Sequence, residues 1–280
     1  MRSDGKRVKN LKPFFEIIPY IMDKRVDSMN FVKQELEAEP IEDYIRDCRT
    51  KGIKMNHLSV LVAAYLRVLS QNPELNRFVI NKRIYARNHF CVSFVTLKRD
   101  GGDEESEQTV VKLRFALDED IFTVSEKIHK AIADNREQTF DNNMDRLLRN
   151  VMRMPWLVSF VVGLIKFADR HNILPASVIE GSPFHTSLFV TNMASIRTNY
   201  IYHHIYEFGT TSIFIALGQP TKNLVMKDGE VVEKKVFPMG VVTDERICSG
   251  HCYANCFKQF AKYLKEPALL EQKAEQVVTE

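Results

Sequence analysis

Near its C-terminus the chain reads Val241-Val242-Thr243-Asp244-Glu245-Arg246-Ile247-Cys248-Ser249-Gly250. The first residues of this stretch are apolar and β-branched, which is typical of a buried strand. A charged triplet, Asp244 to Arg246, then interrupts the apolar run, and a segment with helical periodicity follows Gly250. The stretch therefore predicts a strand that delivers polar side chains to a turn ahead of a helix.

The segments on either side of this stretch favour the same arrangement. Asp228-Gly229 is a pair typical of tight turns, and it joins the strand to an earlier apolar segment at 224–226. After Gly250, apolar side chains recur at helical spacing, at Tyr253, Cys256, Phe257, Phe260, Ala261 and Leu264. We therefore expect a hairpin, a turn and an amphipathic helix in this order.

The rest of the chain mixes helices and strands. Asn56 is a favourable N-cap, apolar residues recur at helical spacing from 58 to 69, and Asn72-Pro73 ends the run. This pattern predicts a one-sided helix packed on a sheet. Further strands are predicted at 77–80, 90–95, 110–115, 187–192 and 213–217, and a further helix at 121–138. The fold class that follows is α/β, a two-layer sandwich with a mixed sheet and helices on one side.

A chain of 280 residues suits one large domain. We predict a basic N-terminal tail at 1–13, followed by a single domain at 14–280 that contains an apolar helical insertion at about 140–182. The tail carries five basic residues, Arg2, Lys6, Arg7, Lys9 and Lys12. Two interpretations of the tail stay open: a solvated segment, or attraction to an anionic membrane surface.

The overall charge is nearly balanced, with Lys+Arg 39 against Asp+Glu 36. A nucleic-acid surface needs a concentrated basic face, so we expect no nucleic-acid partner. No apolar core follows the N-terminal charges, so no signal peptide is predicted.

Five cysteines at scattered positions do not suggest a disulfide framework and favour a cytoplasmic location. The C-x-x-C pairs that a metal site would need are absent. Cys248, Cys252 and Cys256 are interpreted as buried small hydrophobes, with a nucleophilic Cys252 as the alternative.

Three stretches in the correct order carry a resemblance to a known family: 57–78, 188–193 and 227–270. They resemble the catalytic domain of the 2-oxoacid dehydrogenase acyltransferases and of chloramphenicol acetyltransferase. The resemblance covers roughly 14–270, with an insertion. That family reads Asp-His-Arg-x-x-Asp-Gly where this chain has Asp244 to Gly250. The catalytic His position therefore holds Glu245, and the position of the second Asp holds Ser249.

The resemblance implies a homotrimer whose active sites lie between subunits, in a channel entered by coenzyme A and by the acyl acceptor. In the family the His takes a proton from the attacking group, and a Ser or Thr hydroxyl of the neighbouring subunit steadies the oxyanion. That hydroxyl falls on Thr191 here, beside Asn192. The sequence before Phe14 has no room for a lipoyl domain, so we expect no lipoyl group and no working dehydrogenase-complex component.

The missing imidazole leaves three interpretations of Glu245 open. Glu245 is a structural carboxylate, or it is the base and a dry channel raises its pKa, or another residue is the base. The catalytic set that we predict is Thr191, Glu245 and His251. Residues predicted to bind substrate are Asn192, His185, His203, His204 and Ser249. For each histidine the alternative is a polar loop or core residue with no catalytic role, and for His203, His204 and His185 a further alternative is the role of base.

The insertion contains an apolar run, Pro155 to Ile165, flanked by Arg153 and Lys166. It is too short to span a bilayer. The first interpretation is a helix buried against the sheet or another subunit. The alternatives are a lid over a channel for a long acyl chain, or peripheral contact with a membrane, which Trp156 would suit.

Two functional hypotheses follow. The first is a divergent acyltransferase that moves an acyl group from coenzyme A to a hydroxyl, amine or thiol of a small or lipophilic acceptor. The second is a catalytically inactive relative that binds acyl-CoA or lipid, or serves as a trimeric scaffold.

Overall fold

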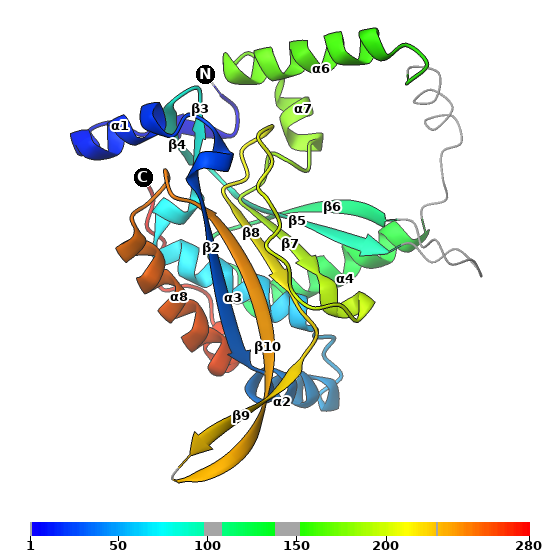
Figure 1. Cartoon of the computed structure of the whole chain (residues 1–280). Helices are drawn as coiled ribbons and strands as arrows, with labels where there is room; N and C mark the ends of the chain where they lie inside the picture. The colour runs from blue at the N-terminus through cyan, green and yellow to red at the C-terminus, as the bar shows by residue number, and fades with distance from the viewer. Residues whose placement is uncertain (1, 98–107, 138–151, 228) are drawn as a thin grey trace.

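The structure is a computed structural model and describes residues 2–97, 108–137, 152–227 and 229–280. Within them the main sheet has seven strands, in the order β2-β10-β8-β7-β5-β6, with β9 paired to β10 (Figure 1). The strands are β2 (Met29–Glu37), β5 (Phe90–Leu97), β6 (Gln108–Phe115), β7 (Leu188–Asn192), β8 (Ile213–Leu217), β9 (Thr221–Lys227) and β10 (Glu230–Asp244). The strands β2, β10 and β8 are antiparallel neighbours, whereas β8, β7 and β5 run parallel. The sheet is therefore mixed, as predicted.

Helices cover one face of this sheet (Figure 1). They are α2 (Ala38–Thr50), α3 (His57–Gln71), α4 (Ile121–Glu137) and α8 (Gly250–Lys265). The other face of β8 and β10 is covered by the segment at 198–206, whose backbone at 200–201 lies directly against Gly218 and Gly240. A side chain at either glycine would collide with that backbone, so the close approach requires glycine. The predicted α/β sandwich with helices on one side is confirmed.

The helix α3 begins where the sequence predicts. The Asn56 side chain accepts a hydrogen bond from the backbone N–H of Ser59 at 2.8 Å, which caps the first turn. The expected one-sidedness is wrong, because residues 59–70 are all buried. The helix contacts α2, α4 and α8 as well as the core beneath it, so apolar neighbours surround it on every side. Its sequence is correspondingly apolar on most of its circumference, with Ser59, Arg67 and Ser70 as buried polar residues.

A small second sheet forms at the N-terminal end from β1 (Gly5–Arg7), β4 (Arg83–Arg87) and β3 (Arg77–Ile80). The predicted solvated tail is therefore wrong over its first residues. Arg2 and Asp4 are buried, and Gly5–Arg7 pairs with β4. Counting basic residues could not show that the charge of Arg2 is matched by the nearby carboxylate of Asp4 and the distant carboxylate of Asp169. The helix α1 (Pro13–Ile21) follows this strand.

The described part of the predicted insertion holds α6 (Pro155–Arg170) and α7 (Ala176–Gly181), whereas 140–151 lies outside the described residues. The interpretation of a buried helix does not hold for the single chain, because only Asp169 of α6 is buried. Among the described residues, no helix is long and apolar enough to cross a membrane. Short 3-10 turns complete the fold, at η1 (Arg25–Ser28), η2 (Pro73–Asn76), η3 (Met193–Ile196) and η4 (Pro267–Leu270).

Candidate functional site

The turn after β10 is held by a buried ion pair. The Arg246 guanidinium donates from Nε to Asp244 Oδ1 at 2.8 Å and from its second terminal nitrogen to Oδ2 at 2.7 Å. Both side chains are fully buried, and Tyr253 donates its hydroxyl to the backbone carbonyl of Asp244. Burial opposes the charge on Arg246, but the hydrogen bonds to Asp244 outweigh it and raise its pKa. A bidentate pair of this kind fixes the turn that presents residue 245.

Glu245 points away from that pair. Its backbone N–H donates to the Ser28 carbonyl at 2.8 Å, and its carboxylate accepts from Asn30 Nδ2 at 3.2 Å. The residue is exposed in the single chain, whereas its neighbours Asp244 and Arg246 are buried. Glu245 and Arg246 therefore face opposite sides. One chain alone therefore leaves Glu245 in contact with water and provides no dry channel around it.

Ser249 and His251 lie at the start of α8. The Ser249 hydroxyl accepts from the backbone N–H of Cys252 at 3.2 Å and caps the helix. His251 is exposed, and its Nε2 lies 3.0 Å from the amide of Asn255, one turn along. The structure thus gives Ser249 a local role that explains the residue without any substrate. The buried ion pair of this region is formed instead by Asp244 with Arg246.

The three thiols of this region lie close together. Cys252 Sγ is 4.0 Å from Cys256 Sγ, and Cys248 and Cys256 are buried. Hydrogen bonds from the Cys248 and Cys256 thiols lower the pKa of Cys252, and the pKa values of those two partners are raised. The expectation of buried, uncharged thiols fits Cys248 and Cys256, whereas half-buried Cys252 is the thiol whose ionised form its neighbours favour.

Thr191 and Asn192 end β7, far from Glu245 in the same chain. Thr191 pairs with Ala216 of β8, which pairs with Gly240 of β10, five residues before Glu245. Strand spacing puts the two levels roughly 16 Å apart along the sheet. The Thr191 hydroxyl lies 3.8 Å from the sulfur of Met193. One chain therefore does not bring the predicted pair together, which agrees with a site that needs a second subunit.

His203 lies over the face of the sheet that faces away from the helices. Its ring stacks on Phe214 of β8, with centroids 4.1 Å apart and planes 6° from parallel. His203 Nδ1 lies 2.9 Å from the His204 carbonyl, which can only accept, so the proton is on Nδ1 and Nε2 has a free lone pair. Burial lowers the pKa of His203, which keeps the ring neutral near pH 7. The neighbouring His204 is exposed.

His203 and Thr191 share this face of the sheet. Phe189 pairs with Phe214 and Thr191 with Ala216, so side chains at 189, 191, 214 and 216 project to the same side. Thr191 is the diagonal neighbour of Phe214, at roughly 8 Å between Cα atoms. The structure therefore places the predicted oxyanion donor next to the aromatic ring on which His203 stacks. Sequence periodicity cannot reveal this, because 203 belongs to a segment without regular structure.

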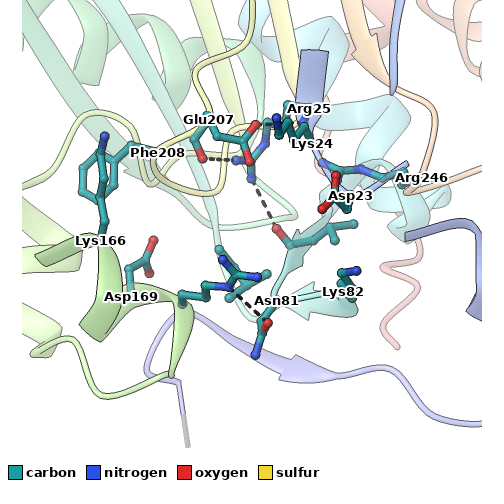
Figure 2. Close-up of a pocket in the computed structure, with 13 residues that line it drawn as sticks. Asp23, Lys24, Arg25, Asn81, Lys82, Lys166, Asp169, Glu207, Phe208 and Arg246 are labelled. Carbon is teal, nitrogen blue, oxygen red and sulfur yellow. Dashed lines mark hydrogen bonds between the residues drawn. The ribbon is translucent and has the colours of Figure 1, made fainter. Parts of the chain in front are cut away.

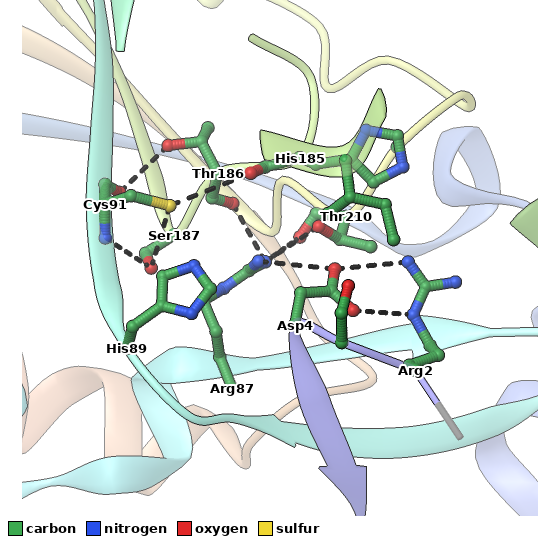
Figure 3. Close-up of polar contacts among 12 residues, drawn as sticks. Arg2, Asp4, Arg87, His89, Cys91, His185, Thr186, Ser187 and Thr210 are labelled. Carbon is green, nitrogen blue, oxygen red and sulfur yellow. Dashed lines mark hydrogen bonds and ion pairs between the residues drawn. The ribbon is translucent and has the colours of Figure 1, made fainter. Parts of the chain in front are cut away.

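His185 belongs to a buried charged network instead (Figure 3). Its Nδ1 lies 2.8 Å from the Ser182 hydroxyl, and its Nε2 lies 3.3 Å from an Asp169 carboxylate oxygen. Asp169 also accepts from Arg2, which donates in turn to Asp4. The prediction that His185 binds substrate is not supported, because its ring is fully buried and engaged within the fold.

A cavity of about 360 Å³ opens between the end of α1, the turn joining β3 to β4, and the polar end of α6 (Figure 2). One wall is Arg25, which is fully buried and donates to the carbonyls of Glu207 at 2.7 Å and Gly209 at 2.9 Å. Its Nε lies 3.9 Å from Asp244 Oδ2, so the cavity adjoins the turn after β10. Burial lowers the pKa of Arg25, and Asp244 opposes that shift. The sequence carried no signal for Arg25, because its partners lie up to 219 positions away (244 − 25).

No group of three or more His, Cys, Asp or Glu side chains suited to a metal ion occurs in the part of the chain that the structure describes.

Comparisons with known proteins agree with this architecture. Residues 171–271 match the family model described as 2-oxoacid dehydrogenases acyltransferase (catalytic domain). No curated protein matches the sequence. Because the family match covers the C-terminal part of the chain, it supports the resemblance there, including the turn after β10 and α8.

Solved structures extend the likeness over nearly the whole chain. A probable dihydrolipoamide acetyltransferase from Listeria monocytogenes 4b F2365 has a TM-score of 0.57 at 12% identity, covering 93% of this chain and 95% of that one. Chloramphenicol acetyltransferase has a TM-score of 0.57 at 10% identity, covering 93% and 100%. The cubic core of the pyruvate dehydrogenase multienzyme complex has a TM-score of 0.57 at 12% identity, covering 94% and 93%. The predicted resemblance is confirmed, and at these identities the structures establish the fold.

Proposed function

We propose that this chain is a divergent acyltransferase that moves an acyl group from a coenzyme A thioester to a hydroxyl, amine or thiol of a small or lipophilic acceptor. The family match over 171–271 and the acyltransferase fold support the reaction class. The observation that carries the proposal is the placement of His203, whose free Nε2 lies on the same sheet face as Thr191.

The chemistry assigned to these residues is proton transfer and charge stabilisation. His203 Nε2 accepts the proton of the acceptor group as its oxygen, nitrogen or sulfur attacks the thioester carbonyl carbon. The electron pair of the carbonyl moves to oxygen, and the Thr191 hydroxyl donates to that oxyanion. Collapse breaks the carbon–sulfur bond, and the coenzyme A sulfur leaves with the proton that His203 returns.

Glu245 has a positioning role in this proposal. Its exposure and its hydrogen bond from Asn30 suit a carboxylate that holds the turn after β10 against β2. The buried Asp244–Arg246 pair keeps that turn rigid beside Arg25. His251, one turn further on, would then contact the acceptor or coenzyme A instead of acting as the base.

Self-association is part of the proposal. The exposed aromatic rings beside His203, those of Phe31 and Tyr202, pack edge to face at 5.7 Å on the open side of the sheet. A trimer that covers this side would exclude water from His203 and Thr191, which strengthens every electrostatic contact there. We also propose a cytoplasmic location, which the free state of all five cysteines supports.

The test is release of coenzyme A thiol from acetyl-CoA and from longer acyl-CoAs, with and without candidate acceptors. With an acceptor that supports turnover, His203→Gln should lower kcat by about a hundredfold to ten-thousandfold. Thr191→Val should lower it by about a hundredfold or more. The matched control His204→Gln, which changes the exposed neighbouring ring, should leave kcat within about threefold.

Glu245→Gln separates this proposal from a base at position 245. If Glu245 has only a positioning role, kcat changes by less than about tenfold, because glutamine can still accept from Asn30. If Glu245→Gln lowers kcat by more than about a hundredfold while His203→Gln leaves kcat unchanged, then Glu245 is the base. The pH profile gives a second readout, since the lowered pKa of a base at His203 should keep kcat/KM high to below about pH 6.5.

A non-catalytic relative is the second candidate, and the absence of an imidazole at position 245 favours it. Such a protein would bind acyl-CoA or lipid without turnover. Calorimetric binding of acyl-CoA, together with no thiol release above the buffer rate for any acceptor tested, would select this candidate over the first.

A further inference from the structure

The helix α6 has the opposite burial pattern to that of a normal surface helix. Such a helix normally buries its apolar residues and exposes its charged ones. In α6 the only buried residue is Asp169, which is paired with Arg2 and His185. Large apolar side chains face solvent instead: Trp156 at 70%, Phe160 at 66%, Leu164 at 56% and Phe167 at 55% exposed. An ion pair therefore anchors the helix, and its apolar surface is presented outward.

The helix α1 repeats this feature at the same end of the molecule (Figure 1). Ile18 and Pro19 are buried and Phe15 is half-buried, while four further apolar residues are exposed: Phe14, Ile17, Tyr20 and Ile21. Leu224 and Met226 on the β9–β10 hairpin are also exposed, but that hairpin projects from the opposite end of the sheet. Two separate apolar helices at one end make a patch that needs a physical explanation.

Between α1 and α6 lies the cavity of about 360 Å³, and its lining is cationic (Figure 2). Lys24 follows α1, Lys82 comes from the turn joining β3 to β4, and Lys166 and Arg170 come from α6. Within the described residues, none of these four is ion-paired with a carboxylate. Lys82 lies over the Tyr20 ring at 5.6 Å from the centroid, which ties the cationic lining to the apolar face of α1.

The carboxylates that line the same cavity are largely engaged. Asp169 is paired with Arg2 at 2.7 Å, and the Glu207 carboxylate accepts from the backbone N–H of Arg25 at 2.8 Å. Asp23 is the remaining acidic residue of the lining. Asp23 and Glu207 both keep a negative charge without an ion pair among the described residues, so four unpaired cations against two such carboxylates give the cavity a net positive field that suits an anion.

We propose that α1, α6 and the cavity between them form a docking surface for a membrane that contains anionic phospholipid. The two helices lie in the interface with their apolar side chains among the acyl chains, and the cationic cavity receives a headgroup phosphate. Charge complementarity selects this occupant over a second protein copy, because an apolar protein partner would leave the four cations unmatched. The proposal is independent of the proposed acyl transfer.

The placement of particular side chains fits an interface. Trp156 begins α6, next to Arg153, and tryptophan is the side chain that headgroup regions favour. Lys166 and Arg170 near the other end have stems long enough to reach headgroups while the neighbouring apolar residues insert. Neither helix needs to cross the bilayer for this contact.

Trp156 makes the test direct, because it is the only tryptophan in the chain. The full chain is mixed at low salt with vesicles of phosphatidylcholine alone, or of phosphatidylcholine with phosphatidylglycerol. We expect co-sedimentation and a blue shift of the Trp156 emission with the anionic vesicles only, both weakened by added salt. Soluble glycerophosphoglycerol should cause no blue shift. If it does, the cavity binds a free phosphate ester and the membrane proposal is wrong.

Matched variants locate the surface. Phe160→Gln with Leu164→Gln should weaken partitioning at least tenfold, and Lys82→Gln with Arg170→Gln should weaken it about twentyfold. The controls Leu224→Gln and Lys258→Gln remove an equally exposed apolar residue and a cation elsewhere, and should partition like the unchanged chain. Circular dichroism and the urea midpoint check that each variant is folded.

Three further results with vesicles would overturn the proposal. The unchanged chain fails to bind anionic vesicles at low salt, or the α6 variants bind as tightly as it does, or Leu224→Gln weakens binding as much as they do. Sedimentation velocity decides the main rival: if Phe160→Gln with Leu164→Gln dissociates an oligomer and leaves vesicle binding unchanged, another copy of the chain covers α6.

Discussion

The helices α3 and α6 are both rich in apolar residues, yet their surroundings are opposite. Residues 59–70 of α3 are buried without interruption, whereas Asp169 is the only buried residue of α6. The polar residues differ in the opposite direction, since α3 is capped by half-buried Asn56 at its start and α6 is anchored by the buried carboxylate of Asp169. An apolar composition predicts that a helix will be buried. It does not predict which surface will cover the helix.

The largest effect that separates the two helices is expected from matched leucine truncations. Leu66→Ala in α3 removes a side chain that is 1% exposed, and should lower the free energy of unfolding by about 3 kcal/mol. Leu164→Ala in α6 should change it by less than about 0.5 kcal/mol, because that side chain is already in water. Urea unfolding monitored by circular dichroism measures both. An equal cost at Leu164 would mean that α6 is covered in solution.

The anchor of α6 should come next in size. Asp169→Asn keeps the shape of the side chain but removes the charge that meets Arg2 and faces His185, and should cost about 2 kcal/mol. Glu126→Gln, at an exposed position of α4, is the control, with an expected change near zero. Limited proteolysis should cut within α6 earlier in Asp169→Asn than in the unchanged chain. Equal stability of the two proteins would contradict the anchoring role.

The same anchor should give the protein a dependence on acid. Burial raises the pKa of Asp169, but His185 and Arg2 outweigh it, so the pKa lies below its ordinary value. A carboxyl with a depressed folded pKa adds stability above its unfolded pKa of about 3.9, and this is lost as pH falls through the folded value. The urea midpoints of the unchanged chain and of Asp169→Asn should therefore differ at neutral pH and converge below about pH 4. A constant difference would rule out this linkage.

The smallest effect is expected on the exposed side of α6. Gly163 lies mid-helix, and a Cβ added there meets no atom within 4 Å. Gly163→Ala should therefore stabilise the protein by about 0.5–1 kcal/mol, because alanine loses less conformational entropy in a helix. Thermal unfolding measures the gain. A loss of stability would place a neighbour against this side of the helix.

Much of the fold could be predicted from local pattern. The cap at Asn56, the strand through Val241 and Val242, and the hairpin ahead of it all depend on residues near one another in sequence. The mixed sheet followed from the alternation of these elements. The burial of α3 on all sides was missed, because apolar periodicity shows one face clearly and does not show how many neighbours will pack around it.

The candidate site was harder to predict. The family position at 245 was found from its motif, but its exposure and the buried Asp244–Arg246 pair beside it appear only in three dimensions. His203 had no periodic signal, and its value as a base comes from a carbonyl that fixes the proton and a ring, Phe214, that shields one face. The sequence did not predict a role for Arg25, because the hydrogen-bond partners of its side chain are distant in sequence.

The sequence by itself determined some of the helices and strands, among them α3, α8 and β10, and the turn that follows β10, whereas β2 and α2 were not predicted. These outcomes depend on backbone propensity, capping and short-range periodicity, which act over a few residues. Only the tertiary structure decided that α3 is buried on all sides while the apolar residues of α6 are exposed. It also decided that the charges of Arg2, Asp4 and Asp169 are buried together. Burial and charge pairing depend on which surfaces meet, and segments far apart in the chain meet only once the whole chain has folded.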